Sequence, residues 1–570
     1  MRYYALATDY DGTLAHHGRV DEATLQALER LRSSSRRLIL VTGRELDDLS
    51  RVFSRLDLFD QVVAENGALL YTPQSREERL LAEKPPEDFV ARLRQRGVGP
   101  ISVGRSVVAT WRPHAVTVLQ AISELGLELQ VIFNKDAVMV LPTGVNKATG
   151  LAVALNELGL SRHNVAAIGD AENDHAFLRC CACSAAVANA LPTLKERADF
   201  VTKGDHGAGV VELIDMMLRD DLQELEPRLT RHHVLLGWTD DERQVGIKPY
   251  GESILITGTS GGGKSTMATG LLERLAEQGY QFCIVDPEGD YTTFEKVIVL
   301  GDPQRPPNVN EIVKVLEHPE QNVAVNMIGL AIEHRAAFFA SLLPHLAEMR
   351  TRTGRPHWLV LDETHHLLPA SGEASAATLG RDLNGFMFIT VHPEHVSKAI
   401  LSFVDLIIAI GKSPGESIRQ TSRCLDEPPP RVPEVELRPG EGLMWRRREG
   451  QDPVWFRSEP PRTEMRRHFR KYAEGELEPE KSFYFRGPDR KLNLRAQNLN
   501  LFLQIAQGID DETWMYHLKR GDYSRWLRTA LQDEALAAEV EEVERHRKIS
   551  PKESRELIRA SIEERYTAPA

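Results

Sequence analysis

Residues 4–14 read YALATDYDGTL, and this stretch decides the fold of the first part of the chain. A run of strand-forming residues ends in two aspartates, Asp9 and Asp11, and the next residue is a glycine that permits a turn. Further runs such as RLILVTGR and VAAIGDAE alternate with helical periods, one of which begins at the N-cap residue Asp21. This alternation predicts an α/β fold with a parallel sheet, whose site residues lie at the carboxyl ends of the strands.

Length and composition limit the classes of protein. A chain of 570 residues favours three or four domains. The 70 basic and 83 acidic residues give a net charge of −13, which excludes a uniformly basic nucleic-acid coat but not a local basic patch. Five cysteines are too few for a disulfide framework. Because the chain shows neither a secretion pattern nor an apolar run of about 20 residues, we expect a cytoplasmic protein with no membrane partner.

Four segments of the first 226 residues carry polar side chains at strand or helix ends. In chain order they contribute Asp9, Asp11, Thr42, Lys147, Asp170, Asn173 and Asp174. One aspartate can act as a nucleophile, and a second, two residues on, as general acid and base. Acids from the first and last segments can hold Mg²⁺, while a hydroxyl and a lysine can bind phosphate oxygens. The pattern therefore predicts a site at which an aspartate faces a phosphate.

In order, DYDGTL, VTGR, Lys147 and GDAEND resemble the four motifs of the haloacid dehalogenase superfamily of phosphohydrolases. The resemblance covers residues 1–226. It implies that Asp9 is the phosphorylated nucleophile, that Asp11 is the acid and base, and that Thr42 and Lys147 bind the phosphate. The Mg²⁺ ligands that it implies are Asp9, Asp11 through its backbone carbonyl, Asp170 and Asp174. An aspartate at position 11 is typical of the phosphatase branch.

Residues from about 80 to 142 interrupt the rhythm and predict a small α+β insertion. The insertion is similar to the type-II cap of the branch that includes sucrose-phosphate phosphatases, and AENGA at 64–68 also fits that branch. Such caps decide the leaving group, so the resemblance implies a phosphomonoester substrate of the sugar-phosphate kind. Arg44, Asn66 and Arg105 are candidates for substrate contacts.

The stretch GTSGGGKS at 258–265 fits the P-loop pattern G-x-x-x-x-G-K-[ST] between a predicted strand and a predicted helix. Backbone amides and the helix N-terminus would bind the phosphates of ATP. Lys264 would reach the β- and γ-phosphates, and Ser265 would ligate Mg²⁺. The residues predicted to bind nucleotide are Gly258, Thr259, Ser260, Gly261, Gly262, Gly263, Lys264, Ser265, Thr266 and Asp362.

The stretch WLVLDETHHLL at 358–368 predicts an apolar strand that ends in two acids. We expect Asp362 to hold Mg²⁺ through its water shell and Glu363 to polarise the attacking water. A glutamate there suits hydrolysis coupled to movement more than transfer to a small acceptor. We do not expect a metal site at His365 and His366, because adjacent residues do not share a helix face.

With IVDPEGDY at 284–291 and FITVHPEHV at 388–396, residues 228–472 resemble the HerA and conjugative-transfer branch of the FtsK-like motor ATPases. In that branch the residue that senses the γ-phosphate is commonly glutamine. Here Thr390 or His392 takes the position. The β-barrel that precedes the ATPase in the full HerA architecture is absent, and the phosphatase-like region occupies its place.

The resemblance implies a homo-oligomer, usually a hexameric ring with an arginine supplied in trans. The candidates for that arginine are Arg419, Arg423 and the run Arg446–Arg448. The basic segment 444–471, with Trp445, Trp455 and Phe456 interleaved, could bind nucleic acid. It could also be a solvated strap against the acidic remainder, and we favour this second interpretation.

The last 95 or so residues predict a helix-rich domain with a small aromatic core of Trp514, Tyr516, Trp526 and Leu527. His517, Asp522 and Arg525 could form a site there, but a structural role is favoured. The cysteines at 180, 181 and 183 are expected to be core residues rather than metal ligands.

The sequence therefore predicts a bifunctional enzyme with three domains. A phosphatase domain spans 1–226, a RecA-like P-loop ATPase spans 227–475, and an accessory domain spans 476–570. The ATPase would be coupled to the phosphatase or would regulate it. The alternatives are a nucleic-acid translocase, an end-processing polynucleotide phosphatase or kinase-phosphatase, and a nucleotide-gated assembly module.

Overall fold

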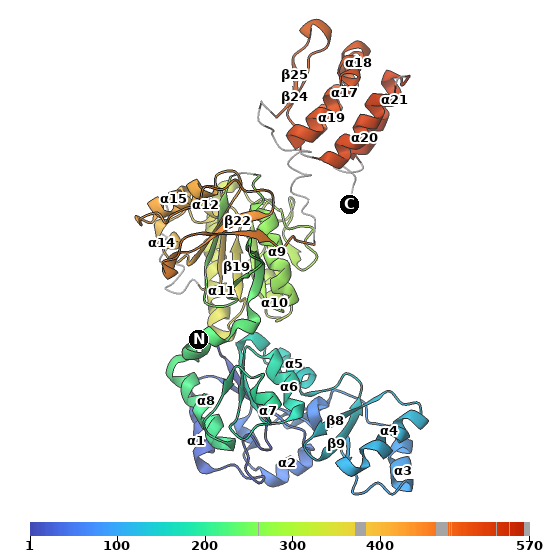
Figure 1. The fold of residues 1–570 in the computed structure, drawn as a ribbon, viewed down its shortest axis with the longest axis vertical. Coiled ribbons are helices and arrows are strands. Elements are labelled where there is room, and N and C mark those ends of the chain that lie inside the picture. Colours follow the sequence, from blue (N-terminus) through green and yellow to red (C-terminus); the bar gives the residue numbers. More distant parts are fainter. Residues whose placement is uncertain are drawn as a thin grey trace. The chain divides into compact units, whose positions relative to one another are not determined.

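The chain forms two compact units in a computed structural model, Met1–Arg462 and Thr463–Ala570, here called the first and second units (Figure 1). The residues that the structure describes are 1–259, 261–370, 384–462, 477, 479, 481–531, 533–546 and 548–563. Across these ranges, no helix combines the length and the apolar character needed to cross a membrane.

The N-terminal sheet has eight strands in the order β12-β11-β10-β1-β2-β3-β4-β5. Its strands are β1 (Ala5–Thr8), β2 (Arg37–Val41), β3 (Gln61–Ala64), β4 (Leu69–Thr72), β5 (Glu77–Leu80), β10 (Val165–Gly169), β11 (Cys183–Ala186) and β12 (Phe200–Val201). Its helices are α1 (Glu22–Ser33), α2 (Leu46–Val52), α5 (Lys147–Glu157), α6 (His175–Cys180), α7 (Pro192–Lys195) and α8 (His206–Asp220). The strands from β12 to β3 are parallel, whereas β4 and β5 are antiparallel additions.

Local sequence explains the first elements of this sheet. All four residues of β1 are buried, as expected for a central strand of a parallel sheet with both faces covered. The carboxylate of Asp21 caps α1 by accepting the backbone N–H of Thr24 at 2.7 Å. Cys181 and Cys183 are buried and free, so the expected core role of this cysteine cluster is confirmed for both.

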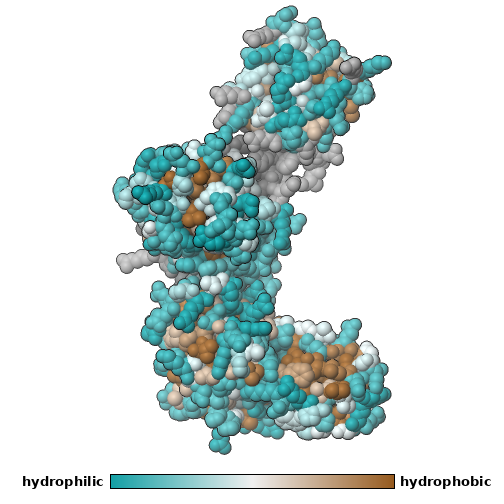
Figure 2. Space-filling view, in the orientation of Figure 1, coloured by the Kyte–Doolittle hydropathy of each residue, from teal (hydrophilic) through white to brown (hydrophobic). Residues whose placement is uncertain are grey.

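The cap is a separate four-stranded antiparallel sheet, in the order β6-β7-β9-β8, with two helices against it. Its elements are α3 (Glu87–Gln95), β6 (Ser102–Val103), β7 (Val108–Trp111), α4 (Ala115–Glu124), β8 (Leu129–Asn134) and β9 (Ala137–Pro142). Apolar side chains gather on the surface of the cap (Figure 2), and the exposed ones include Trp111, Val116 and Leu119. The predicted α+β insertion is confirmed.

The ATPase-like sheet has eleven strands in the order β14-β13-β23-β22-β21-β15-β20-β19-β16-β18-β17. They are β13 (Val234–Trp238), β14 (Gln244–Ile247), β15 (Ile254–Gly258), β16 (Phe282–Asp286), β17 (Ile298–Leu300), β18 (Val323–Asn326), β19 (Trp358–Leu361), β20 (Phe386–Thr390), β21 (Leu406–Ile410), β22 (Glu441–Arg446) and β23 (Val454–Ser458). Its main helices are α9 (Lys264–Glu277), α10 (Val309–Leu316), α11 (Ile332–Thr353) and α15 (Pro414–Cys424). The seven strands from β21 to β17 are parallel, and β20 lies between β15 and β19. The residues that follow these three strands therefore share one edge of the sheet.

The second unit contains a short hairpin and a group of helices. Its elements are β24 (Phe483–Phe485), β25 (Leu494–Ala496), α17 (Leu499–Gly508), α18 (Asp511–Lys519), α19 (Asp522–Trp526), α20 (Glu534–Arg545) and α21 (Pro551–Ile562). Trp514, Trp526 and Leu527 lie in its core as predicted, whereas Tyr516 is only half-buried. The α/β fold class with a cap, a P-loop sheet and a helical C-terminus is confirmed.

The imidazole of His517 in the second unit is hydrogen-bonded to its neighbours. The Nδ1 of His517 lies 2.9 Å from a carboxylate oxygen of Asp522, and its Nε2 accepts the backbone N–H of Arg486 at 3.0 Å. These contacts use both ring nitrogens, which supports the structural role that the sequence favoured for His517 and Asp522.

Candidate functional site

Three buried carboxylates meet at the carboxyl ends of β1 and β10. Asp9 follows β1, Asp170 follows β10, and Asp174 lies on the turn after Asp170. One oxygen from each lies within 4.8 Å of the others. Lys147, the first residue of α5, is fully buried and donates to Asp9 and Asp174 at 2.5 Å each. Asp174 in turn accepts the backbone N–H groups of Asp170 and Ala171 at 2.8 and 2.9 Å, which fixes its carboxylate.

The cluster places three carboxylates around the ammonium group of Lys147, so the acids outnumber it. Burial raises the pKa of Asp9 well above its usual range. The charge of Asp174 raises this pKa further, whereas Lys147 lowers it. Burial also raises the pKa of Asp170, and the hydrogen bond from the ammonium group of Lys135 partly offsets this rise. Burial disfavours the charged form of Lys147, but Asp174 and Asp9 outweigh it and raise the pKa of this group. A divalent cation bound by hard oxygen donors would complete the charge balance, so the donor set fits Mg²⁺.

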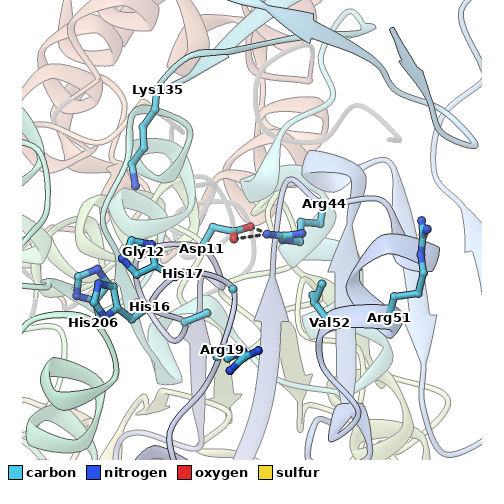
Figure 3. A pocket seen from close by; sticks show the side chains of 12 residues that line it. Asp11, Gly12, His16, His17, Arg19, Arg44, Arg51, Val52, Lys135 and His206 are labelled. Atoms are coloured by element: carbon cyan, nitrogen blue, oxygen red, sulfur yellow. Dashed lines mark hydrogen bonds and ion pairs between the residues drawn. The ribbon is translucent and has the colours of Figure 1, made fainter. Parts of the chain in front are cut away.

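The other residues predicted for the first site lie around this cluster. Thr42 follows β2 with a buried side chain, and its hydroxyl accepts the backbone N–H of Arg44 at 3.1 Å. Arg44 donates to both oxygens of Asp11 at 2.6 and 2.7 Å (Figure 3). It also pairs with Asp48. The hydrogen bonds with Asp11 are the first cause of the raised pKa of Arg44. The fork of Arg44 therefore orients the carboxylate of Asp11.

The two remaining candidates for substrate contacts have other partners. Asn66 is buried and accepts a hydrogen bond from the side chain of Asn173 at 3.0 Å. The guanidinium of Arg105 pairs with Asp47 and with Glu78, the latter at 2.7 Å. Arg105 thus joins the cap to the core sheet through ion pairs, which is a positioning role.

Sequence reasoning missed two charged residues that tie the cap to the core. Lys135, at the tip of the β8–β9 hairpin, donates to Asp170 at 2.7 Å. Glu65 is fully buried and accepts the backbone N–H groups of Ser106 and Val107 at 2.7 and 3.1 Å. The turn FNKDA at 133–137 was the only signal for Lys135, since it places a lysine between two alternating strands. Glu65 lies within the stretch AENGA at 64–68, but nothing in that stretch indicated a contact with the cap.

The P-loop connects β15 to α9. A side chain at Gly258 would meet the backbone oxygen of Ile410 at 2.1 Å, and the φ of this glycine is +145°, so the position requires glycine. Lys264 begins α9, and its ammonium donates to the carbonyls of Gly258 and Thr259 at 3.2 Å each. The remaining predicted residues of the loop lie beside them, with Ser265 buried and Thr266 exposed, while Ser260 lies outside the described residues.

The acids predicted for ATP hydrolysis follow β19. Asp362 and Glu363 are both buried, and Glu363 adopts a left-handed backbone with φ of 41°. Such strain in a residue other than glycine is typical of functional sites. Asp286, at the end of the neighbouring β16, has its pKa raised to about 7 by burial and by the charge of Asp362. The sheet therefore brings together three carboxylates of the ATPase-like domain.

The end of β20 carries the residues considered as γ-phosphate sensors. The hydroxyl of Thr390 is buried, lies 3.0 Å from Nδ1 of His365 and accepts the backbone N–H of His392 at 3.0 Å. Thr390 is thus directly linked to His365, which lies 3.5 Å from Glu363. His392 is exposed and, with Glu394 and His395, places donor atoms within 4.8 Å of one another.

The candidate arginines of this domain all have partners in the described part of the chain. Arg419 and Arg423 each pair with Glu416 at 3.0 Å. The run Arg446–Arg448 pairs, residue by residue, with Glu252, Glu427 and Asp405. Trp445 and Phe456 are buried, so these two rings are not free to stack on bases, and residues 463–476 lie outside the described residues. These ion pairs support the contact with acidic groups that the strap interpretation predicts. The described part of the segment is not a solvated strap, however, because it contributes β22 and β23 to the sheet.

Comparison with known proteins separates the same two regions. Residues 6–106 and 107–214 match the family profile described as haloacid dehalogenase-like hydrolase, and residues 239–365 match that described as the central domain of helicase HerA. A phosphoglycolate phosphatase of Methanothermobacter thermautotrophicus is 32% identical over 220 residues, which are 37% of this chain and 96% of that protein. Phosphoglycolate phosphatase 2 of Saccharolobus solfataricus is 30% identical over 223 residues, which are 37% of this chain and 91% of that protein.

Solved structures give a similar match to the N-terminal part. A haloacid dehalogenase-like hydrolase from Bacteroides thetaiotaomicron covers 38% of this chain and 99% of its own, with 20% identity and a TM-score of 0.34. Two of the family motifs supply the buried acids around Lys147, and the second matched region contains the P-loop. The chain is an enzyme that carries a HerA-like central domain, and through its N-terminal domain it belongs to the haloacid dehalogenase-like hydrolase family.

Proposed function

We propose that the N-terminal domain is a Mg²⁺-dependent phosphatase that hydrolyses a phosphomonoester through an aspartyl-phosphate on Asp9. The observation that carries this proposal is the buried cluster in which Lys147 bonds to Asp9 and Asp174. Burying charged groups costs free energy, and a buried ion-pair cluster contributes little to net stability. Such clusters with perturbed pKa values are typical of functional sites. Its position at the carboxyl edge of a parallel sheet, beneath a cap, suits a small phosphate ester.

The hydrolysis would proceed in two displacement steps, in which each residue has its own role. Thr42 and Lys147 would hold the phosphoryl oxygens while a carboxylate oxygen of Asp9 attacks phosphorus and the bond to the leaving oxygen breaks. Asp11 would give its proton to that oxygen, then take a proton from the water that attacks the aspartyl-phosphate, which restores Asp9 and releases phosphate. Asp9, Asp170 and Asp174 would hold Mg²⁺, which would offset the repulsion between Asp9 and the phosphate.

For the second domain we propose ATP binding and hydrolysis within a homo-oligomer. Lys264 would contact the phosphates of ATP, and Ser265 would ligate Mg²⁺. Asp362 would hold the metal through its water shell, and Glu363 would polarise the attacking water. The close grouping of Asp286, Asp362 and Glu363 at one sheet edge supports this proposal. We also propose that the nucleotide state regulates the phosphatase.

The test is phosphate release with Mg²⁺, with and without ATP, by the full chain and two variants. The substrates are sugar phosphates, phosphorylated DNA ends and phosphoglycolate, which the names of the relatives add to the panel. Asp9→Asn should lower phosphomonoester turnover by at least about a thousandfold and spare ATP hydrolysis. Lys264→Ala should do the reverse and abolish any effect of ATP on the phosphatase. Turnover confined to DNA ends would contradict the small-ester assignment, and unchanged turnover in Asp9→Asn would contradict the mechanism.

A further inference from the structure

A pocket lined largely by histidine, arginine and lysine side chains opens beside Asp11 (Figure 3). Its volume is about 780 Å³, within the range of small-molecule sites. Seven of its twelve lining residues are basic or histidine: His16, His17, Arg19, Arg44, Arg51, Lys135 and His206. The acid among the twelve is Asp11, and Arg44 already pairs with it. Arg44 also pairs with Asp48, and Lys135 pairs with Asp170. An anionic ligand would therefore draw on the other basic side chains of the lining.

The three histidines form one wall of this pocket because two distant segments meet there. His16 stacks on His17 with 4.2 Å between ring centroids, and on His206 with 4.4 Å. Figure 3 shows these rings together on one side of the pocket and Arg44 on the other. The side chain of Asn189 joins the segments, since it donates to the carbonyl of Gly12 and accepts the backbone N–H of His206.

The loop that carries His16 and His17 is braced rather than loose. His16 and Arg19 exchange two backbone hydrogen bonds at 2.9 and 3.1 Å, which close a tight hairpin. The hydroxyl of Tyr10 donates to the carbonyl of Gly18 at 3.0 Å and holds the hairpin tip. The backbone that carries these exposed basic side chains is thus held next to the candidate site before a ligand arrives, which favours specific binding.

Some basic side chains of the pocket lining are paired with acids, and others remain available to an anionic ligand. Lys135 pairs with Asp170, and His206 lies 3.6 Å from Asp205. Among the residues that the structure describes, neither Arg19 nor His16 has an acidic partner within 4.0 Å. An anion in the pocket would meet these two side chains without displacing an existing ion pair.

We propose that the wall formed by His16, His17, Arg19 and His206 binds a second anionic group of the substrate, a carboxylate or a second phosphate. The substrate class is then a small phosphomonoester with an additional negative charge. This inference rests on the proposed phosphatase function and adds to it the residues that choose the substrate. The transferred phosphoryl group lies over Asp9, and the second anion lies on the other side of Asp11.

The experiment compares pairs of substrates that differ in the second anion. Phosphoglycolate is paired with 2-hydroxyethyl phosphate, and fructose 1,6-bisphosphate with fructose 6-phosphate. The two pairs distinguish a carboxylate from a second phosphate. The readout is the ratio of kcat/KM within each pair, measured with the full chain, with Arg19→Gln and with His16→Gln. The matched control is Arg55→Gln, because Arg55 pairs with Glu29 and Asp57 away from the pocket.

We expect at least one pair to show a ratio of roughly 10 to 100, the range for a charge-assisted hydrogen bond. Arg19→Gln and His16→Gln should lower that ratio, whereas Arg55→Gln should not. Equal turnover within both pairs, or ratios that neither pocket variant changes, would overturn the inference and leave the phosphatase function standing. Faster turnover of a 5′-phosphorylated oligonucleotide than of every small substrate would overturn it in favour of nucleic-acid ends. Phosphate release from no substrate would overturn the proposed function together with the inference.

Discussion

The ammonium group of Lys147 is the positive centre of a site that buries three carboxylates. Its side chain is fully buried and lies 2.5 Å from both Asp9 and Asp174. Removal of a buried partner leaves uncompensated charge, which is far more damaging than the net contribution of the pair. The same contacts that stabilise the fold therefore hold Asp9, the proposed nucleophile, in place.

Lys147→Met should destabilise the N-terminal domain by about 3–5 kcal/mol at neutral pH and abolish phosphatase activity. The destabilisation should be smaller at pH 5 than at pH 8, because burial raises the pKa of Asp9 and a protonated carboxyl needs no counter-charge. Urea unfolding at the two pH values measures the difference. Lys203→Met, which changes an exposed lysine, is the control and should be neutral. Equal destabilisation at both pH values would contradict the charge argument.

The backbone of Glu363 is held in a left-handed conformation at the end of β19. The strain is consistent with a side chain aimed at a ligand rather than chosen for stability. Glu363→Gln keeps the size of the side chain but removes the carboxylate that we propose acts on the attacking water. We expect ATP hydrolysis to fall roughly 10²- to 10⁴-fold while ATP binding is retained.

Nucleotide binding and steady-state turnover, measured together, test this expectation. Lys264→Ala should lose binding, which separates the two roles. Glu348→Gln, on the exposed side of α11, should change neither quantity. Full ATP turnover in Glu363→Gln would remove the glutamate from the hydrolytic step.

At the scale of the element, the tip of the β8–β9 hairpin connects the cap to the core through an ion pair with Asp170 and a backbone hydrogen bond to the carboxylate of Glu172. Lys135 lies at its tip, with a φ of 52°, and reaches Asp170. Lys135→Ala should raise the KM of the phosphatase about tenfold and change kcat less, since the half-exposed ammonium orders the cap over the substrate. Steady-state kinetics measure this split. Asp136→Ala, the adjacent turn residue, is the control, and an equal effect there would point to the hairpin backbone instead.

The sequence predicts those parts of the fold and site that depend on neighbours along the chain. Asp9 and Asp170 could be placed because each ends an apolar strand, and parallel strands share a carboxyl edge. Lys264 could be placed because glycines and a helix start surround it. Contacts made by tertiary packing gave no such pattern. Glu65 accepts amides some 40 residues away.

The contacts within the histidine wall, and those of the candidate γ-phosphate sensor Thr390, could not be predicted for the same reason. His16 and His206 are about 190 residues apart, and nothing near either one marks it as a pocket residue. The link between Thr390 and His365 likewise crosses from β20 to α12 (Thr364–Leu367), the short helix after β19, so it needed the strand order of the sheet.

At the scale of the whole first unit, the two α/β domains share a buried polar junction. His163 stacks on Tyr280 with 3.7 Å between centroids, and Nε2 of His357 lies 3.2 Å from the side-chain oxygen of Asn164. Asn164 precedes β10 and His357 precedes β19, so the junction joins the amino ends of the strands. Both candidate sites follow the carboxyl ends. A signal from ATP to the phosphatase would therefore pass through the two sheets rather than by direct contact of the sites.

The junction makes the first unit sensitive to acid. Burial lowers the pKa of His357 to about 3 and that of His232 to about 4, and it also lowers the pKa of His163. Between pH 6.5 and these values the unfolded chain binds more protons than the folded one, so stability is lost as the pH falls. From pH 7.5 to pH 5, His357 alone should contribute a loss of about 2 kcal/mol.

His357→Gln isolates this contribution, because an amide can still accept the N–H of Gln281 and donate to Asn164. We expect the variant to be less stable than the wild type at pH 7.5 but to lose less of its melting temperature between pH 7.5 and pH 5. The slope with pH is the quantity to compare, since lost packing shifts both values alike. His334→Gln, at an exposed position on α11, should keep the slope of the wild type. If His357→Gln kept it too, the acid response would have to come from groups outside this junction.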